Sequence, residues 1–177
     1  LPPFNSEEET RLLLKMQSKA NERITATATA LRNGLIALAD QIFPGVNIAF
    51  DPNTKNANGH EKWVDFFLRY WHKDCVCQYS MEAFTESYRG WCKRKNYKFR
   101  TDTAHKIYLL AQEGVATLPR CESTKMLITQ ACTSLNAVWE AKQSTLAVGC
   151  NAPRIRGCNA DGRSRTHYRA CSYGRNW

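Results

Sequence analysis

The first part of the chain has the hydrophobic pattern of one long amphipathic helix. Apolar or small residues recur at three- and four-residue spacings between residues 13 and 42, so they fall on one helix face. A capping-box pair at 6 and 9 favours a helix start, and the Pro-Gly pair at 44–45 favours its end. The threonines between 25 and 29 and Gly34 are poor helix formers. We therefore expect a kink or break in the middle third.

Residues 60–77, HEKWVDFFLRYWHKDCVC, contain a stripe of aromatic side chains. Five rings share one face at helical spacing: Trp63, Phe66, Phe67, Tyr70 and Trp71. At about 150–250 Å² per buried aromatic residue, this stripe could bury on the order of 1,000 Å² and anchor the core. The charged residues between the rings are expected to face water: Lys62, Asp65, Arg69 and Lys73.

The same helical spacing predicts three further helices downstream. They are expected from Ser80 to about Cys92, from residue 101 to a point before Pro119, and over about 122–147. Residues 46–50, VNIAF, form the one short segment that could be a strand. The pattern predicts an all-α fold of four to five helices, and 177 residues are expected to form a single domain, 1–177.

Cysteines are concentrated in the second half of the chain. There are eight, all after position 74: Cys75, Cys77, Cys92, Cys121, Cys132, Cys150, Cys158 and Cys171. This even number favours four disulfides formed in an oxidising compartment, although eight cysteines allow 105 pairings. We therefore expect a cysteine-free N-terminal helix within 1–50 and a disulfide-bonded helical core over 60–150.

The start of the chain and its hydropathy bear on location. The sequence begins with Leu1 and two prolines rather than methionine, as a mature protein does after its signal peptide has been cleaved. No uncharged apolar run approaches the 18 or more residues of a membrane-spanning helix. The expected location is secreted or extracellular, or periplasmic, without a transmembrane segment.

The net charge of +9 is unevenly distributed along the chain. Residues 151–177, predicted to form an irregular basic tail, contain one acid and six arginines: Arg154, Arg156, Arg163, Arg165, Arg169 and Arg175. A second cluster within 88–100 has no acid and six basic residues: Arg89, Lys93, Arg94, Lys95, Lys98 and Arg100. Such clusters attract anionic partners and accelerate their association, so both sets are candidate binding residues.

Histidines close to acidic residues are the candidates for acid–base chemistry. If the protein is an enzyme, His60, His72 and His105 could act as acid or base in the hydrolysis of a phosphodiester. The motif that joins His72 to Cys75 and Cys77 could bind zinc, but structural zinc sites usually contain two well-spaced pairs. Disulfides explain these cysteines better, so we predict no metal and no other cofactor.

The leading functional hypothesis is a secreted, disulfide-rich helical binding protein without enzymatic activity. It would be an effector, toxin or recognition factor that uses its basic surfaces to bind an acidic protein, a sulfated glycan or an anionic membrane surface. Sequence-specific recognition of nucleic acid is not expected, because arginine-rich segments carry no base code. The alternative is a secreted hydrolase of the phosphodiesterase or nuclease kind.

Overall fold

The computed structural model describes the backbone of residues 6–150 and the side chains of residues 7–145. Within this range the chain is mostly helical and contains no strand, which confirms the predicted all-α class. The elements are α1 (Ser6–Ile42), η1 (Val46–Ala49), α2 (Lys62–Phe67), α3 (Asp74–Cys77), α4 (Met81–Arg94), α5 (Thr101–Glu113) and α6 (Glu122–Cys150). The predicted basic tail, 151–177, and its six arginines lie outside the described residues.

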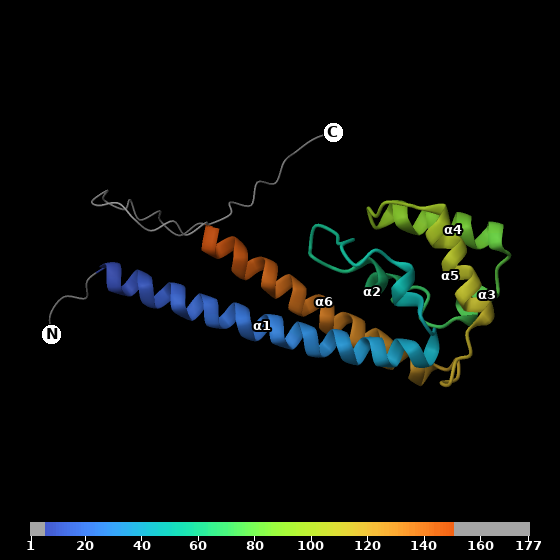
Figure 1. The fold of residues 1–177 in the computed structure, drawn as a ribbon, viewed down its shortest axis with the longest axis horizontal. Helices are drawn as coiled ribbons and strands as arrows, with labels where there is room; N and C mark the ends of the chain where they lie inside the picture. Colours follow the sequence, from blue (N-terminus) through green and yellow to red (C-terminus); the bar gives the residue numbers. More distant parts are fainter. Residues whose placement is uncertain (1–5, 151–177) are drawn as a thin grey trace.

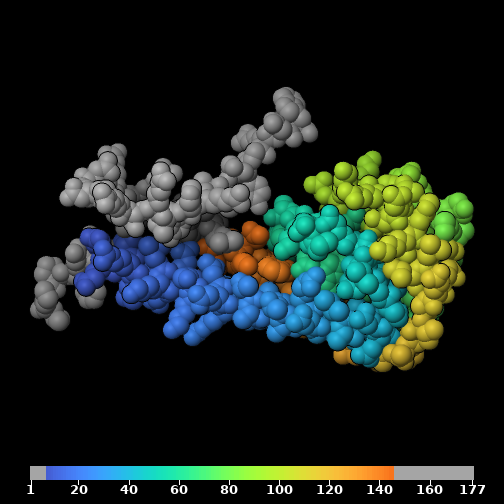
Figure 2. All heavy atoms as spheres, viewed as in Figure 1, coloured from blue at the N-terminus to red at the C-terminus, as the bar shows by residue number. Residues whose placement is uncertain are grey.

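The two long helices, α1 and α6, run side by side in opposite directions (Figure 1). Near their far end the side-chain amide of Gln17 donates a hydrogen bond to the backbone oxygen of Thr145, at 3.1 Å. The shorter helices gather at the other end of this pair, where α1 finishes and α6 begins (Figures 1 and 2). The core therefore lies at one end of a long helical hairpin.

The core is built around the aromatic stripe of residues 63–71. Four of the five stripe residues are buried and Trp71 is half-buried, which confirms that the stripe is structural. Phe66 is fully buried at its centre and contacts rings from α1's end, η1, α2, the following turn and α4: Phe43, Phe50, Phe67, Tyr70, Tyr88 and Trp91. One side chain thus joins most of the elements at this end of the molecule.

The stripe does not lie on one continuous helix, and this gives six α-helices within residues 6–150 instead of four to five. α2 ends at Phe67, and a turn follows in which His72 Nδ1 accepts a hydrogen bond from the backbone N–H of Asp74 at 3.2 Å. The backbone N–H of Lys73 donates to the carbonyl of Ile42 at 3.3 Å. These bonds end one helical segment and attach the next, α3, to the end of α1.

Helices α4 and α5 match their predicted ranges closely. Ser80 caps α4, because its hydroxyl accepts a hydrogen bond from the backbone N–H of Ala83 at 3.2 Å. Basic residues occupy the last turn of α4, where the helix dipole favours positive charge. α5 ends at Gly114, where an added Cβ would lie 2.7 Å from the carbonyl oxygen of Leu110. A side chain at position 114 would therefore displace the chain.

The first fifty residues differ from the sequence analysis in one expectation and resolve one open candidate. α1 is continuous over 37 residues, without the expected break. The hydroxyl of Thr29 donates within the helix to the carbonyl of Thr25 at 2.9 Å, and packing along α6 adds stability that local propensity lacks. The possible strand at 46–50 is the 3-10 helix η1, which packs against α1 and α5.

Several side chains differ in solvent exposure from what the helical pattern predicts. Lys62 and Asp65 are 5% and 2% exposed, although the helical pattern placed them toward water. Conversely, two apolar residues that the helical spacing would place inward, Val115 and Leu127, are 78% and 58% exposed. Burial here depends on the surrounding segments more than on position along one helix.

The predicted disulfide framework is not found among the described residues. Five cysteines in this range are free thiols: Cys75, Cys77, Cys92, Cys121 and Cys132. A disulfide requires two Cβ atoms about 3.5–4.5 Å apart, whereas these thiols lie against other groups. Cys77 Sγ, for example, donates to the carbonyl of Ala111 at 3.2 Å. Cys150, Cys158 and Cys171 lie outside the range of described side chains. The disulfide-bonded core expected over 60–150 is instead held by aromatic packing.

Thiol reactivity should therefore differ sharply between cysteines. Hydrogen bonds from Thr124 lower the pKa of the exposed Cys121 thiol, whereas burial raises the pKa of Cys132 to about 12. We expect iodoacetamide at pH 8 to label Cys121 first and Cys132 last in the native protein, as read by peptide mass spectrometry. An unreactive Cys121 that becomes reactive only after reduction would show that it forms a disulfide with a cysteine outside the described range.

Candidate binding site

The three candidate histidines do not form a common centre. His60 lies in the loop before α2, His72 lies in the turn between α2 and α3, and His105 is exposed on α5. His72 is 2% exposed, and its Nε2 lies 3.2 Å from the carbonyl oxygen of Leu118. The structure thus places each histidine in a separate environment.

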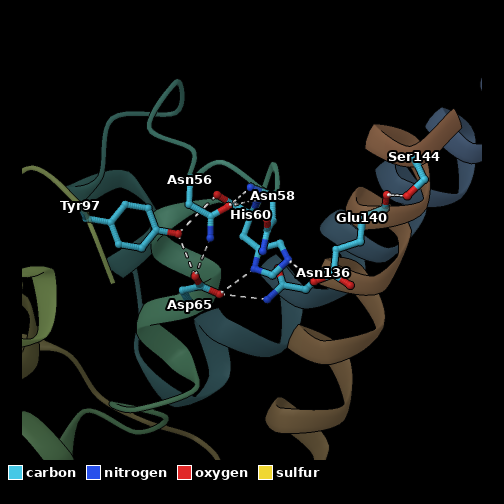
Figure 3. A network of polar contacts seen from close by, with 8 residues as sticks. All are labelled: Asn56, Asn58, His60, Asp65, Tyr97, Asn136, Glu140 and Ser144. Atoms are coloured by element: carbon cyan, nitrogen blue, oxygen red, sulfur yellow. Dashed lines mark hydrogen bonds and ion pairs between the residues drawn. The ribbon is translucent and has the colours of Figure 1, made fainter. Parts of the chain in front are cut away.

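Asp65, on α2, is the centre of a buried polar network (Figure 3). Its carboxylate accepts hydrogen bonds from the Tyr97 hydroxyl at 2.8 Å and from the Asn136 amide at 2.9 Å. The Asn56 amide nitrogen lies 3.5 Å from Asp65 Oδ2, and His60 Nδ1 lies 3.5 Å from Asp65 Oδ1. A buried carboxylate is costly unless several donors satisfy it, and these donors come from three separate segments: the loop before α2, the segment after α4, and α6.

His60 joins this network to α6 (Figure 3). Its Nδ1 faces Asp65, and its Nε2 lies 2.9 Å from Glu140 Oε1. The Asn56 side chain accepts a hydrogen bond from the His60 backbone N–H at 2.9 Å, which fixes the loop. Both ring nitrogens therefore face carboxylates, so neither is directed at open solvent as a general base would require. The arrangement is that of a structural link between the loop and α6.

Removing the central carboxylate should destabilise the fold strongly. In Asp65→Ala the donors of Tyr97, Asn136 and His60 lose their buried acceptor, so we expect the free energy of unfolding to fall by about 3–5 kcal/mol. Urea denaturation followed by circular dichroism measures this change. Glu122→Ala, which breaks an exposed pair with Lys125, is the control and should change stability by less than about 0.5 kcal/mol. Equal effects of the two substitutions would contradict the assignment.

Lys62 is the second charged residue buried against the aromatic core. Its Nζ donates to the backbone oxygen of Lys98 at 2.7 Å and lies 5.1 Å and 5.8 Å from the ring centres of Tyr88 and Tyr97. Burial lowers the pKa of Lys62, an effect that the neighbouring Cys92 partly opposes. The ammonium group thus fixes the segment after α4 to the aromatic core.

The six basic residues of 88–100, here called the basic face, are all exposed: Arg89, Lys93, Arg94, Lys95, Lys98 and Arg100. Arg89 forms an ion pair with Glu86 at 3.0 Å, and its guanidinium lies 4.8 Å from the ring centre of Phe99. Among the described residues the other five have no ion-pair partner. The structure thus places these sequence-derived candidates together on the last turns of α4 and the segment that follows.

A cavity of about 510 Å³ opens beside the basic face. Its polar lining comes from the loop after η1, from α2 and from the segment before and within α5: Asp51, Thr54, Lys62, Lys98, Arg100 and Thr103. Sequence reasoning included Lys98 and Arg100 as binding residues but missed the other four. No feature of the sequence indicated that Lys62 lines a cavity, because a lysine beside an aromatic stripe normally faces water.

Neither a metal cluster nor a membrane-spanning helix is found among the described residues. In the part of the chain that is described, no three or more histidine, cysteine or acidic side chains are arranged to hold a metal ion. No described helix is both long and apolar enough to cross a membrane. Comparison with protein-family models, with curated proteins and with solved structures gave no match to this chain. The basic face, the cavity and the buried network are therefore the features of the molecule that bear on its function.

The stability contribution of Lys62 should depend on pH. Because burial lowers its folded-state pKa below the ordinary value of 10.5, the unfolded chain binds more protons between these two pKa values. The stability of the wild type relative to Lys62→Met should therefore rise as pH increases through the folded-state pKa toward 10.5. Urea unfolding of both proteins from pH 7 to pH 10.5 measures this difference. A difference that does not change with pH would show that Lys62 is solvated in the folded state.

Proposed function

We propose that the protein is a binding protein that recognises a polyanion through its basic face. The observation that carries this proposal is that five exposed cations, which have no ion-pair partner among the described residues, project from one short segment: Lys93, Arg94, Lys95, Lys98 and Arg100. Unpaired cations at this density raise the local concentration of anions and accelerate their binding. The basic tail, 151–177, is proposed as a second binding element.

A polyanion such as a sulfated glycan fits the basic face better than an acidic protein or a membrane surface does. Protein interfaces usually contain an apolar, desolvated centre, and membrane surfaces are usually bound by basic residues combined with exposed apolar ones. The large hydrophobic residues exposed in the described part of the chain do not include any from 88–100. Ile48, 72% exposed, lines the neighbouring cavity, but the exposed large side chains of 88–100 itself are cationic, which favours a ligand whose binding is mainly electrostatic.

The alternative, a secreted hydrolase, receives less support from the positions of the histidines. The two ring nitrogens of His60 face Asp65 and Glu140, His72 is buried, and His105 is exposed on α5, where it interacts electrostatically with Glu82. Catalytic acid–base groups need access to the substrate and a positioned partner. Binding without catalysis is therefore the proposal that these positions favour.

Export of the protein, as an effector, toxin or recognition factor, is part of the same proposal. It is supported by the basic composition, which suits a protein that binds acidic ligands, whereas the five described cysteines are free and add no support. The reduction-dependent labelling of Cys121 described above tests the disulfide component separately. A fully reduced protein isolated from its natural source would overturn the proposed export while leaving the basic face unaffected.

Binding to a polyanion should weaken with salt and with loss of the basic face. We expect the triple variant Lys93→Gln/Arg94→Gln/Lys95→Gln to bind heparin about tenfold more weakly, since three exposed charge contacts contribute about 1–2 kcal/mol together. Fluorescence anisotropy with labelled heparin at several salt concentrations measures both effects.

The matched control for this experiment is Lys15→Gln/Lys19→Gln/Arg23→Gln, which removes the same three charges from the exposed side of α1. Affinity independent of salt, or equal losses in both triple variants, would contradict recognition by the basic face. Replacement of Arg163, Arg165 and Arg169 by alanine tests the tail on its own, and a further loss would assign it a part in binding.

A further inference from the structure

We propose that the cavity beside the basic face is a specific site for one phosphate or sulfate group of the polyanion. This inference rests on the proposed function and adds a defined subsite to it. The basic face alone would bind any polyanion diffusely, whereas a cavity lined by converging cations can select a single tetrahedral oxyanion.

Basic residues from two parts of the chain, α2 and residues 98–100, line the cavity. Lys62 is 5% exposed, and its Nζ donates to the Lys98 carbonyl at 2.7 Å and lies over the rings of Tyr88 and Tyr97, so it adds a buried, already hydrogen-bonded positive charge to the lining. Lys98 and Arg100 are exposed and line the same space. Because their side chains alternate along an extended segment, both can reach the cavity from one side while Phe99 turns away toward the core.

Asp51, the acidic side chain in the cavity lining, lowers the positive charge there without cancelling it. Asp51 Oδ1 accepts a hydrogen bond from the backbone N–H of Asn53 at 2.9 Å, so this side chain stabilises its own turn. Within the described residues Asp51 forms no ion pair with Lys62, Lys98 or Arg100. With three basic residues against one acid, the lining keeps an excess of positive charge that attracts an incoming anion.

Hydroxyl donors and an apolar wall complete the site. Thr54 and Thr103 line the cavity, and Thr103 belongs to the first turn of α5, where the helix dipole adds to the attraction for an anion. Ile48 and Phe50 form an apolar side, and Lys106 holds this wall by donating to the Ile48 carbonyl at 3.2 Å. A volume of about 510 Å³ accommodates more than a bare oxyanion, so the group would enter together with the sugar unit that carries it.

The test is calorimetric titration of the full chain with small anions at low ionic strength. The probes are inorganic phosphate, inorganic sulfate, glucose 6-phosphate and glucose 6-sulfate, with sodium chloride as the reference for non-specific charge. We expect the sugar esters to bind more tightly than the inorganic ions, because they also contact the apolar wall. Comparison of the two phosphate probes with the two sulfate probes shows which oxyanion the site prefers.

The decisive variant is Lys98→Gln/Arg100→Gln, since both residues are exposed and their loss leaves the core intact. We expect it to weaken binding of the preferred sugar ester at least tenfold. Lys15→Gln/Lys19→Gln removes two charges from α1 and should change the affinity less than twofold. Thr103→Val gives a separate readout without a charge change, and a threefold or greater loss would place the ligand at the start of α5.

The possible results separate the cavity from the proposed function. If heparin binds but none of the four small anions does, the cavity site is wrong and recognition by the basic face stands. The same conclusion holds if Lys98→Gln/Arg100→Gln and Lys15→Gln/Lys19→Gln weaken binding of the small anions equally. If neither heparin nor the small anions bind, both proposals are wrong. Binding of the small anions that is lost only in the cavity variants supports the site.

Discussion

The packing of aromatic rings around Phe66 is the interaction on which the rest of the structure depends. Phe66 contacts rings from two regions that are far apart in sequence, the segment from the end of α1 to η1 and helix α4. Edge-to-face and stacked contacts of this kind contribute about 0.5–1.5 kcal/mol each beyond the burial of apolar area. Since the five described cysteines are free, these rings, rather than disulfides, fix the short helices against the α1–α6 hairpin.

Periodicity predicted the parts of this fold that are determined locally. The buried stripe, the start of α4 at Ser80 and the all-α class followed from apolar spacing and capping residues. The positions of Lys62 and Asp65 did not, because their partners lie far away in sequence: Lys98 is 36 residues from Lys62, and Asn136 is 71 residues from Asp65. A helical pattern shows which residues share a face. It does not show which hydrogen-bond donors or acceptors from distant parts of the chain lie against that face.

The candidate site also has a part that could be predicted from the sequence and a part that could not. Composition was sufficient to identify the basic residues of 88–100, because a dense cluster of positive charge without an acid is normally solvated, and all six are exposed. The cavity could not be predicted, since it exists only where the loop after η1, α2 and the start of α5 meet. The disulfide expectation failed in the described range for a related reason: the number of cysteines carries no information about the distances between them.

The buried network and the basic face are mechanically connected through residues 97–100. On the inner side of this segment, the Tyr97 hydroxyl donates to Asp65, and the Lys98 carbonyl accepts from Lys62. On the outer side, the Lys98 and Arg100 side chains face the cavity. A backbone fixed at two points loses less conformational entropy when its side chains bind a ligand than a free loop would. The buried charges of α2 therefore do more than satisfy one another, because they hold in place the exposed charges that the ligand would meet.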